Sequence, residues 1–174
     1  MTRKRKVKIK GGLYGIILSV ILFAAYNFVP DSLLNKFSIS NNTSNTAYVE
    51  RVVDGDTLKI IYNGKHERLR MLGIDTPESV HPSSYKNTPE GKIASEYTKS
   101  RLEGKNVTLE FDTEMHDKYG RILAYVYLGD EMINETLLKN GYAHVLIVPP
   151  NKKYENRFKS LEYMAKIKKI GIWK

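Results

Sequence analysis

Alternation of apolar and polar residues predicts that the chain is rich in short strands after about residue 47. Each predicted strand has a length typical of β-strands and is enriched in Val, Ile, Leu and Tyr. Asn63-Gly64 lies between two of them and is a strong hairpin signal, because both residues tolerate a positive φ. The predicted strands are residues 48–53, 58–62, 65–72, 107–111 and 122–128.

Helical spacing of apolar residues predicts three helices. The first begins near Thr88-Pro89 and is stopped by Gly104, and the second is expected to be short, with Asn134 as its N-cap. The third, residues 154–169, has an apolar stripe opposite a Lys-rich face, which we interpret as solvated surface rather than as a nucleic-acid clamp. Five strands with inserted and terminal helices are typical of an α+β fold, a five-stranded OB-fold barrel with about three α-helices.

The N-terminal region has a different pattern and predicts a membrane anchor. Residues 1–10 form a basic head, and residues 11–29 carry no charge over a length that matches a bilayer core when helical. The basic flank is expected to stay cytoplasmic, so that the chain is a single-pass protein of the cell membrane with its C-terminal domain outside. An uncleaved anchor is favoured over a cleaved leader, which would make the protein secreted.

A polar segment, residues 30–46, follows the predicted anchor. Its Asn, Ser and Thr content is typical of a flexible linker, although its few apolar residues leave a short interfacial helix as the alternative. The remaining residues, 47–174, form the predicted domain.

Charge and composition add little to the predicted fold and domain organisation. The net charge is +9, and a domain charge of +3 remains after the six cations of the basic head are removed, since Asp31 and Lys36 cancel. This mild basic excess is compatible with a polyanionic substrate. The chain has no cysteine, which excludes disulfides and thiolate metal sites, and its four histidines have no ligand spacing.

The candidate chemistry lies at the ends of the first three strands. Asp54-Gly55-Asp56 reads as a tight turn that leaves Asp56 at the mouth of a hairpin. If the strand that carries Arg70 returns antiparallel beside it, Asp56 and Asp75 meet at one end of the sheet. Two carboxylates with backbone carbonyls and water are ligands that suit a hard cation such as Ca²⁺.

Three motifs occur in one order along the chain: Asp54-Gly55-Asp56-Thr57, then residues 68–78, then Asp117-Lys118-Tyr119-Gly120-Arg121. Together they resemble the staphylococcal nuclease (thermonuclease) family over about residues 48–174. Each motif alone has an ordinary structural explanation, as a hairpin turn, a surface ion pair or a polar turn. Their joint occurrence in order favours a nuclease site.

The resemblance implies a role for each motif residue. Asp56, Asp75 and the backbone carbonyl of Thr76 are expected to hold Ca²⁺, which stabilises charge on the phosphate as a Lewis acid. Arg70 and Arg121 are expected to bind phosphate oxygens. Glu78 is left with two alternative roles, general base or water-positioning group.

Substrate holding is the other property that the resemblance implies. Lys118 and Tyr119 match family positions that contact a terminal phosphate and its nucleotide. The chain departs from the family near its nucleotide pocket, where Ile147 and Pro149 stand roughly in place of tyrosines. Base stacking and base preference are therefore expected to differ.

The sequence thus predicts a membrane-anchored, monomeric, Ca²⁺-dependent nuclease that cuts DNA and RNA with little sequence preference. The alternative is a non-catalytic OB-fold module at the cell surface that binds nucleic acid or a protein. Such a module is expected to lack one or more of the charged residues of the site, whereas this chain has Asp56, Arg70, Asp75, Glu78 and Arg121.

Overall fold

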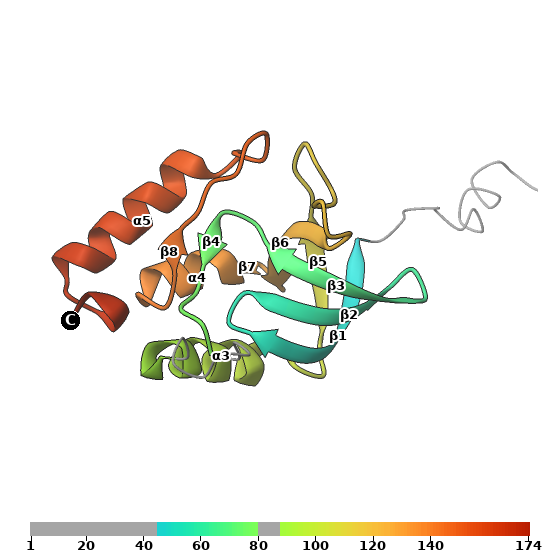
Figure 1. The fold of residues 1–174 in the computed structure, drawn as a ribbon, viewed down its shortest axis with the longest axis horizontal. Helices are drawn as coiled ribbons and strands as arrows, with labels where there is room; N and C mark the ends of the chain where they lie inside the picture. The colour runs from blue at the N-terminus through green and yellow to red at the C-terminus, as the bar shows by residue number, and fades with distance from the viewer. Residues whose placement is uncertain (1–44, 80–87) are drawn as a thin grey trace, which may run out of the picture. The chain divides into compact units, whose positions relative to one another are not determined.

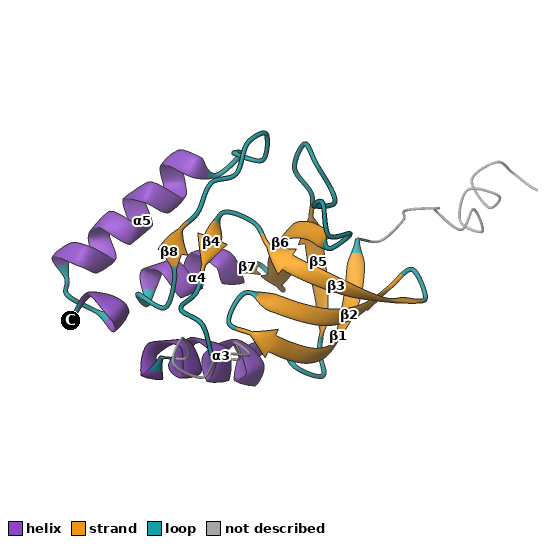
Figure 2. Ribbon diagram, in the orientation of Figure 1, coloured by secondary structure: helices purple, strands orange, loops and turns teal. Residues whose placement is uncertain are grey.

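The computed structural model describes residues 45–79 and 88–174, and these form a small barrel with three α-helices (Figures 1 and 2). The predicted head and membrane helix lie outside the described residues, as does the linker up to residue 44. Within the described ranges, no helix is long and apolar enough to cross a bilayer.

Five strands close the barrel. The hydrogen-bonded order is β3-β2-β1-β5-β6, and a parallel pairing of β3 with β6 joins the two ends, which confirms the predicted OB-type barrel. A two-residue strand, β7, extends the sheet beyond β6. The barrel strands are β1 (Thr46–Asp54), β2 (Thr57–Tyr62), β3 (Lys65–Met71), β5 (Asn106–Glu110), β6 (Ile122–Leu128) and the added β7 (Glu131–Met132).

The three helices are close to their predicted positions. They are α3 (Pro89–Leu102), α4 (Ile133–Lys139) and α5 (Glu155–Ile167), followed by a 3₁₀ turn, η2 (Gly171–Trp173). Thr88 caps α3 as expected, because its side chain accepts a hydrogen bond from the Gly91 amide.

The prediction that Asn134 caps α4 is wrong. Met132 is the N-cap, and Asn134 lies fully buried in the first turn. Its amide group accepts a hydrogen bond from the Val126 amide and donates to the Leu72 carbonyl, both at 2.9 Å. Asn134 therefore joins α4 to β6 and to the end of β3, where it satisfies buried backbone groups that the barrel leaves unpaired.

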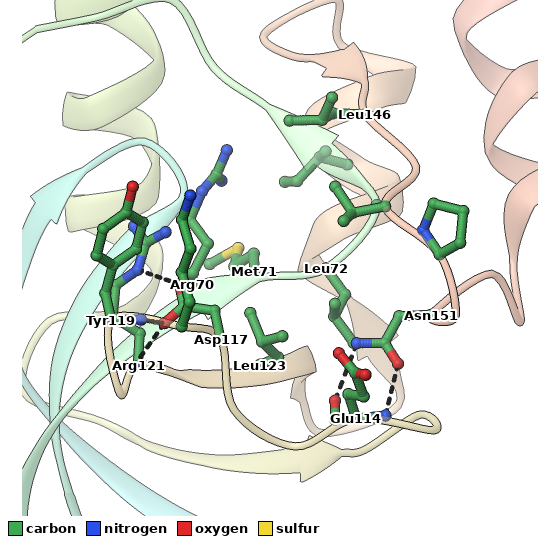
Figure 3. A pocket seen from close by; sticks show the side chains of 15 residues that line it. Arg70, Met71, Leu72, Glu114, Asp117, Tyr119, Arg121, Leu123, Leu146 and Asn151 are labelled. Carbon is green, nitrogen blue, oxygen red and sulfur yellow. Dashed lines mark hydrogen bonds and ion pairs between the residues drawn. The ribbon is translucent and has the colours of Figure 1, made fainter.

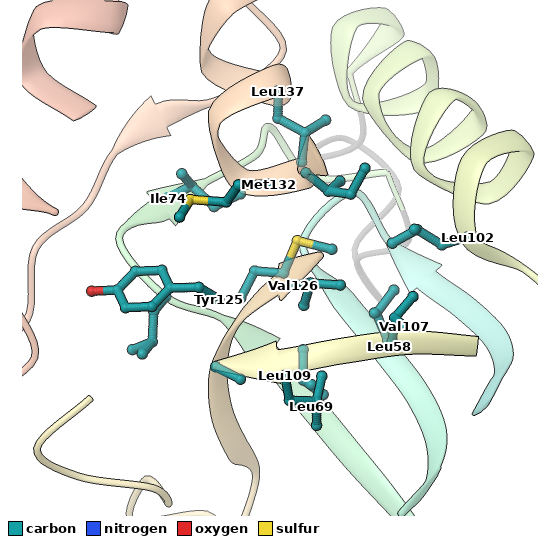
Figure 4. Close-up of a cluster of buried hydrophobic side chains, with 14 of the residues drawn as sticks. Leu58, Leu69, Ile74, Leu102, Val107, Leu109, Tyr125, Val126, Met132 and Leu137 are labelled. Carbon is teal, nitrogen blue, oxygen red and sulfur yellow. The ribbon is translucent and has the colours of Figure 1, made fainter. Parts of the chain in front are cut away.

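The core fills the barrel and the space under α4 (Figure 4). Leu69 and Met71 point into it from β3 in alternation, and Leu72 is buried just after the strand ends. Tyr125 and Phe158 close the end nearest α5, with ring centroids 5.9 Å apart. The fully buried aliphatic residues supply the main stabilisation, at about 25 cal/mol per Å² of apolar area removed from water.

A polar cluster joins the barrel to the start of α5. Glu110 on β5 accepts hydrogen bonds from the hydroxyls of Tyr127 (2.6 Å) and Tyr154 (2.9 Å), and it forms an ion pair with Lys153. Burial raises the pKa of Glu110, but the hydrogen bonds from Lys153 and the two tyrosines outweigh it and the net pKa is lowered from 4.5.

This cluster predicts acid sensitivity. Because the folded-state pKa of Glu110 is depressed, its stabilisation is present above pH 4.5 and is lost as the pH falls through the folded-state pKa. We expect Glu110→Gln to lower the free energy of unfolding at neutral pH by about 1.5–3 kcal/mol, typical of hydrogen bonds to a charged group. Thermal unfolding should then depend less steeply on pH below 4.5 than in the wild type.

The matched control is Glu67→Gln. Glu67 forms no ion pair or side-chain hydrogen bond within the described residues. The Glu67→Gln variant should keep the free energy of unfolding at neutral pH close to wild type. It should also keep the acid slope, which is the pH dependence of thermal unfolding below pH 4.5, close to wild type. An unchanged acid slope in Glu110→Gln would contradict the assignment.

Candidate active site

Arg70 lies between the two aspartates that the sequence singled out. The antiparallel pairing of β2 with β3 places Arg70 opposite Thr57, next to the Gly55-Asp56 turn. Arg70 Nη1 lies 2.6 Å from Asp56 Oδ2 as an ion pair without hydrogen-bond geometry, and Nη2 donates to Asp75 Oδ1 at 2.6 Å. The two carboxylates thus face a single cationic group, which confirms that they meet at one end of the sheet.

Asp56 is a buried charge whose side chain is only 6% exposed. Its Oδ2 accepts hydrogen bonds from the Thr76 amide (2.8 Å) and the Thr76 hydroxyl (3.0 Å), and its Oδ1 accepts one from the Thr57 hydroxyl (3.0 Å). These donors and Arg70 compensate the loss of hydration that burial of a carboxylate entails. Asp56 is therefore fixed in position before any ligand arrives.

A two-stranded sheet that the sequence did not predict holds Asp75. Strand β4 (Ile74–Asp75) pairs with β8 (His144–Val145), and the Leu146 amide donates to the Gly73 carbonyl. Each of these strands has two residues, which is too short for alternation to reveal. Asp75 itself is half exposed, so its carboxylate faces the pocket and solvent.

Glu78 is exposed, and its loop is tied to the first turn through Asp54. Asp54 Oδ1 accepts hydrogen bonds from the Gly55 amide (2.9 Å) and from the Ser79 hydroxyl (2.5 Å). The Glu78 carbonyl accepts a hydrogen bond from the Thr88 amide ahead of α3. Burial, with a smaller contribution from the Asp56 charge, raises the pKa of Asp54.

Arg121 is oriented by Asp117 within one turn. Asp117 Oδ1 accepts hydrogen bonds from the amides of Tyr119 and Arg121, and its Oδ2 accepts one from Arg121 Nε at 2.7 Å (Figure 3). Burial raises the pKa of Asp117, but these hydrogen bonds and the Arg121 charge outweigh it, so the net pKa is lowered. Nη1 and Nη2 of Arg121 form no ion pair with any residue in the described ranges.

These side chains line one cavity of about 200 Å³, which we call the charged pocket. Six of its lining residues were predicted to share one site: Asp56, Arg70, Asp75, Thr76, Glu78 and Arg121. The fold brings them together from four separate segments of the chain. The charged pocket is lined by Asp54, Asp56, Thr57, Arg68, Arg70, Asp75, Thr76, Glu78, Arg121 and Val53.

The donor set of the charged pocket fits a hard cation. Among the described residues, no three His, Asp or Glu side chains form a metal-binding group, but the carboxylates of Asp56 and Asp75 share one cationic partner beside Thr76. All of these donors are oxygens, as Ca²⁺ prefers. Arg70 shows that the two carboxylates already point at one positive charge.

A second cavity of about 420 Å³, the apolar pocket, lies beside the charged pocket and shares Arg70 and Arg121 with it (Figure 3). Leu146, Val148 and Pro149 line it, whereas Ile147 does not. The Ile147 side chain lies near Gly73 instead. That Ile147 and Pro149 stand in place of family tyrosines stays a prediction.

Lys118 and Tyr119 lie at the rim of the apolar pocket. The Tyr119 ring is 72% exposed, with Lys118 Nζ at 5.0 Å and the Arg121 guanidinium carbon at 5.6 Å from its centroid. Cations at these distances are attracted to the face of the ring. An exposed aromatic ring between two cations is suited to a base and its phosphate.

Sequence reasoning missed Asn151, which is buried and holds the loop that leads to Asp117. Its side-chain amide accepts a hydrogen bond from the Glu114 amide at 2.7 Å and donates to the Glu114 carbonyl at 2.9 Å (Figure 3). The only local signal is an Asn after two prolines, which is typical of any turn.

Comparison with known proteins gives consistent results. The family model described as "Staphylococcal nuclease homologue" matches residues 68–174. The thermonuclease of Staphylococcus hyicus is 40% identical over 166 residues, 95% of this chain and 98% of the relative. The thermonuclease of Staphylococcus intermedius is 48% identical over 72% of this chain and 74% of its own length, and endonuclease YncB of Bacillus subtilis is 46% identical over 72% and 60%.

The turn around Asp117 predicts a local effect on order. We expect Asp117→Ala to raise amide hydrogen exchange at Tyr119 and Arg121 by roughly tenfold or more, because each amide loses its acceptor. Exchange in the barrel strands should change little. Asp130→Ala, at an exposed position in the turn between β6 and β7, removes the same charge and should leave residues 117–121 unaffected. Equal exchange in both variants would contradict the assigned role of Asp117.

Proposed function

Because this chain belongs to the staphylococcal nuclease family and is a nuclease, we propose that it cleaves both DNA and RNA with Ca²⁺ and little sequence preference. The observation that carries the proposal is the charged pocket, where two aspartates face one cationic group beside Glu78 and Arg121. A binding module that does not cut has no need for this combination.

Asp56, Asp75 and the carbonyl of Thr76 would hold the ion. Bound there, Ca²⁺ supplies Lewis-acid stabilisation of the charge that develops on the phosphate. Arg70 contacts both carboxylates in this structure, so it competes with a bound cation for them. Release from one or both aspartates leaves the Arg70 guanidinium available to a phosphate group.

Two guanidinium groups bind and orient the phosphate. Arg70 and Arg121 approach the charged pocket from β3 and from the turn before β6. Both stay positively charged at any working pH, and each offers a planar pair of donors that matches two phosphate oxygens. Donors held in place before the reaction stabilise the negative charge that grows on the phosphate oxygens.

Glu78 is the group best placed to handle the proton of the attacking water. It is exposed at the edge of the charged pocket, and the hydrogen bond between Ser79 and Asp54 restrains its loop. An ionised carboxylate there can accept the proton or orient the water through a hydrogen bond. The general-base and positioning roles both require Glu78 to be ionised.

The substrate extends from the charged pocket over Tyr119 and Lys118 toward the apolar pocket. Leu146, Val148 and Pro149 give that pocket an aliphatic lining. Aliphatic side chains contact every base through its flat face without hydrogen bonds, which supports low base preference. We also propose that the protein acts as a monomer held at the cell membrane by residues 11–29, with the nuclease domain outside.

Metal removal tests the cofactor. We expect the purified full chain to cleave single-stranded DNA and RNA with Ca²⁺ and to lose at least about a hundredfold of its rate with chelator, because Lewis-acid stabilisation contributes several kcal/mol. Calorimetry on Asp56→Asn and Asp75→Asn should show weakened Ca²⁺ binding. Equal cleavage with Ca²⁺ and with chelator would exclude the metal mechanism but not the nuclease.

Two substitutions separate catalysis from ion binding. Arg70→Gln and Glu78→Gln should each lower kcat by roughly a hundredfold or more. Arg70→Gln should bind Ca²⁺ at least as tightly as the wild type, since it removes a competing cation. The control Glu96→Gln changes an exposed carboxylate on α3 and should keep wild-type kcat. Wild-type turnover in either site variant would remove that residue from the mechanism.

A further inference from the structure

The outer face of β1, β2 and β3 carries three cations in register. Arg51 on β1 is the partner of Lys59 on β2, and Lys59 is the partner of Arg68 on β3. Partners in antiparallel strands project to the same face, and neighbouring strands lie about 4.8 Å apart. All three residues are exposed, and the three strands lie side by side (Figure 1). We call Arg51, Lys59 and Arg68 the cation row.

The cation row does not serve folding. None of its three side chains forms an ion pair or hydrogen bond with a residue of the described ranges. The nearby carboxylate of Glu50 is paired with His66 at 2.8 Å instead. Like charges directly opposite one another on a sheet are destabilising, so the row carries a cost that an external polyanion would remove.

The cation row begins at the charged pocket. Arg68 lines that pocket, and it also lines a neighbouring cavity of about 450 Å³ with His66, Tyr119 and Arg121. Arg70 follows two residues later on the same face of β3, about 6.7 Å further along the strand. A row of cations therefore leads from Arg70 through Arg68 on β3 and Lys59 on β2 to Arg51 on β1.

We propose that the cation row binds the phosphates of a polynucleotide strand beyond the bond that is cleaved. This inference rests on the proposed nuclease function and extends it by naming a subsite for long strands. The occupant is single-stranded nucleic acid rather than a membrane surface, because the row is continuous with the pocket that would hold the scissile phosphate. Each contact releases counterions, so the row favours long strands and does so most at low salt.

Salt dependence tests the proposal on the full chain. The double variant Arg51→Gln/Lys59→Gln retains Arg68 and so leaves the charged pocket intact. We measure the dissociation constant of a labelled single strand at several salt concentrations, with chelator present so that the strand stays whole. The slope of log affinity against log salt should fall by about 0.7 for each lost phosphate contact, roughly 1.4 in total.

Cleavage provides the second measurement. The kcat/KM for the long strand should fall roughly tenfold or more at low salt, and that for a dinucleotide much less, because a dinucleotide does not reach β2. The matched control, Lys168→Gln/Lys169→Asn, removes two exposed cations after α5. It should keep the wild-type slope of log affinity against log salt and the wild-type ratio of kcat/KM for the long strand to kcat/KM for the dinucleotide. Asn is chosen at 169 because that residue has φ 50°.

Three outcomes would overturn the inference. The first is a wild-type slope of log affinity against log salt in the double variant, and the second is an equal loss of that slope in the control. The third is a double variant that binds phosphatidylserine vesicles less tightly than the wild type but binds DNA equally well. Absence of cleavage of either substrate by the wild-type chain would instead contradict the proposed function, and the binding slope would still decide whether the cation row contacts nucleic acid.

Discussion

The pairing of Arg70 with two aspartates is the interaction on which the site depends. Its guanidinium lies 2.6 Å from both Asp56 and Asp75. Asp56 comes from the turn between β1 and β2, and Asp75 lies on β4. Without that cation, or another in its place, a buried carboxylate would face a half-exposed one with nothing between them. The barrel therefore has to keep a positive charge at this point, whether it is a guanidinium or a metal ion.

The scaffold fixes this arrangement through backbone pairing rather than through the charged residues themselves. The β2–β3 register sets Arg70 beside the first turn, and the short β4–β8 sheet sets Asp75. Asn134 then holds the carbonyl of Leu72 between the two segments. Because each of these ties is buried or paired, the backbone that carries the charged side chains is held in place before a ligand binds.

The surfaces on the two sides of the charged pocket differ in their chemistry. On one side, an aliphatic pocket with Tyr119 and Lys118 at its rim offers contacts that any base can make. On the other side, Arg68 leads to a surface with positive charge and no internal partner in the described part of the chain. Both surfaces offer contacts to features common to all nucleotides, a flat base and a charged phosphate, and this supports the proposed low specificity.

Local structure and the chemical character of the site residues could be predicted from the order of residues along the chain. Period-two and helical patterns located five strands and three helices, and the three motifs contain six predicted site residues that line the charged pocket. Short-range periodicity and turn chemistry are encoded in neighbouring residues. The fold was needed to show that Asn134 bridges strands instead of capping a helix and that Leu146 and Val148 face the apolar pocket. It was also needed to show that Arg51, Lys59 and Arg68 form one row. Those facts depend on which distant strands pair and in what register, and barrel closure fixes that register through contacts between residues far apart in the chain.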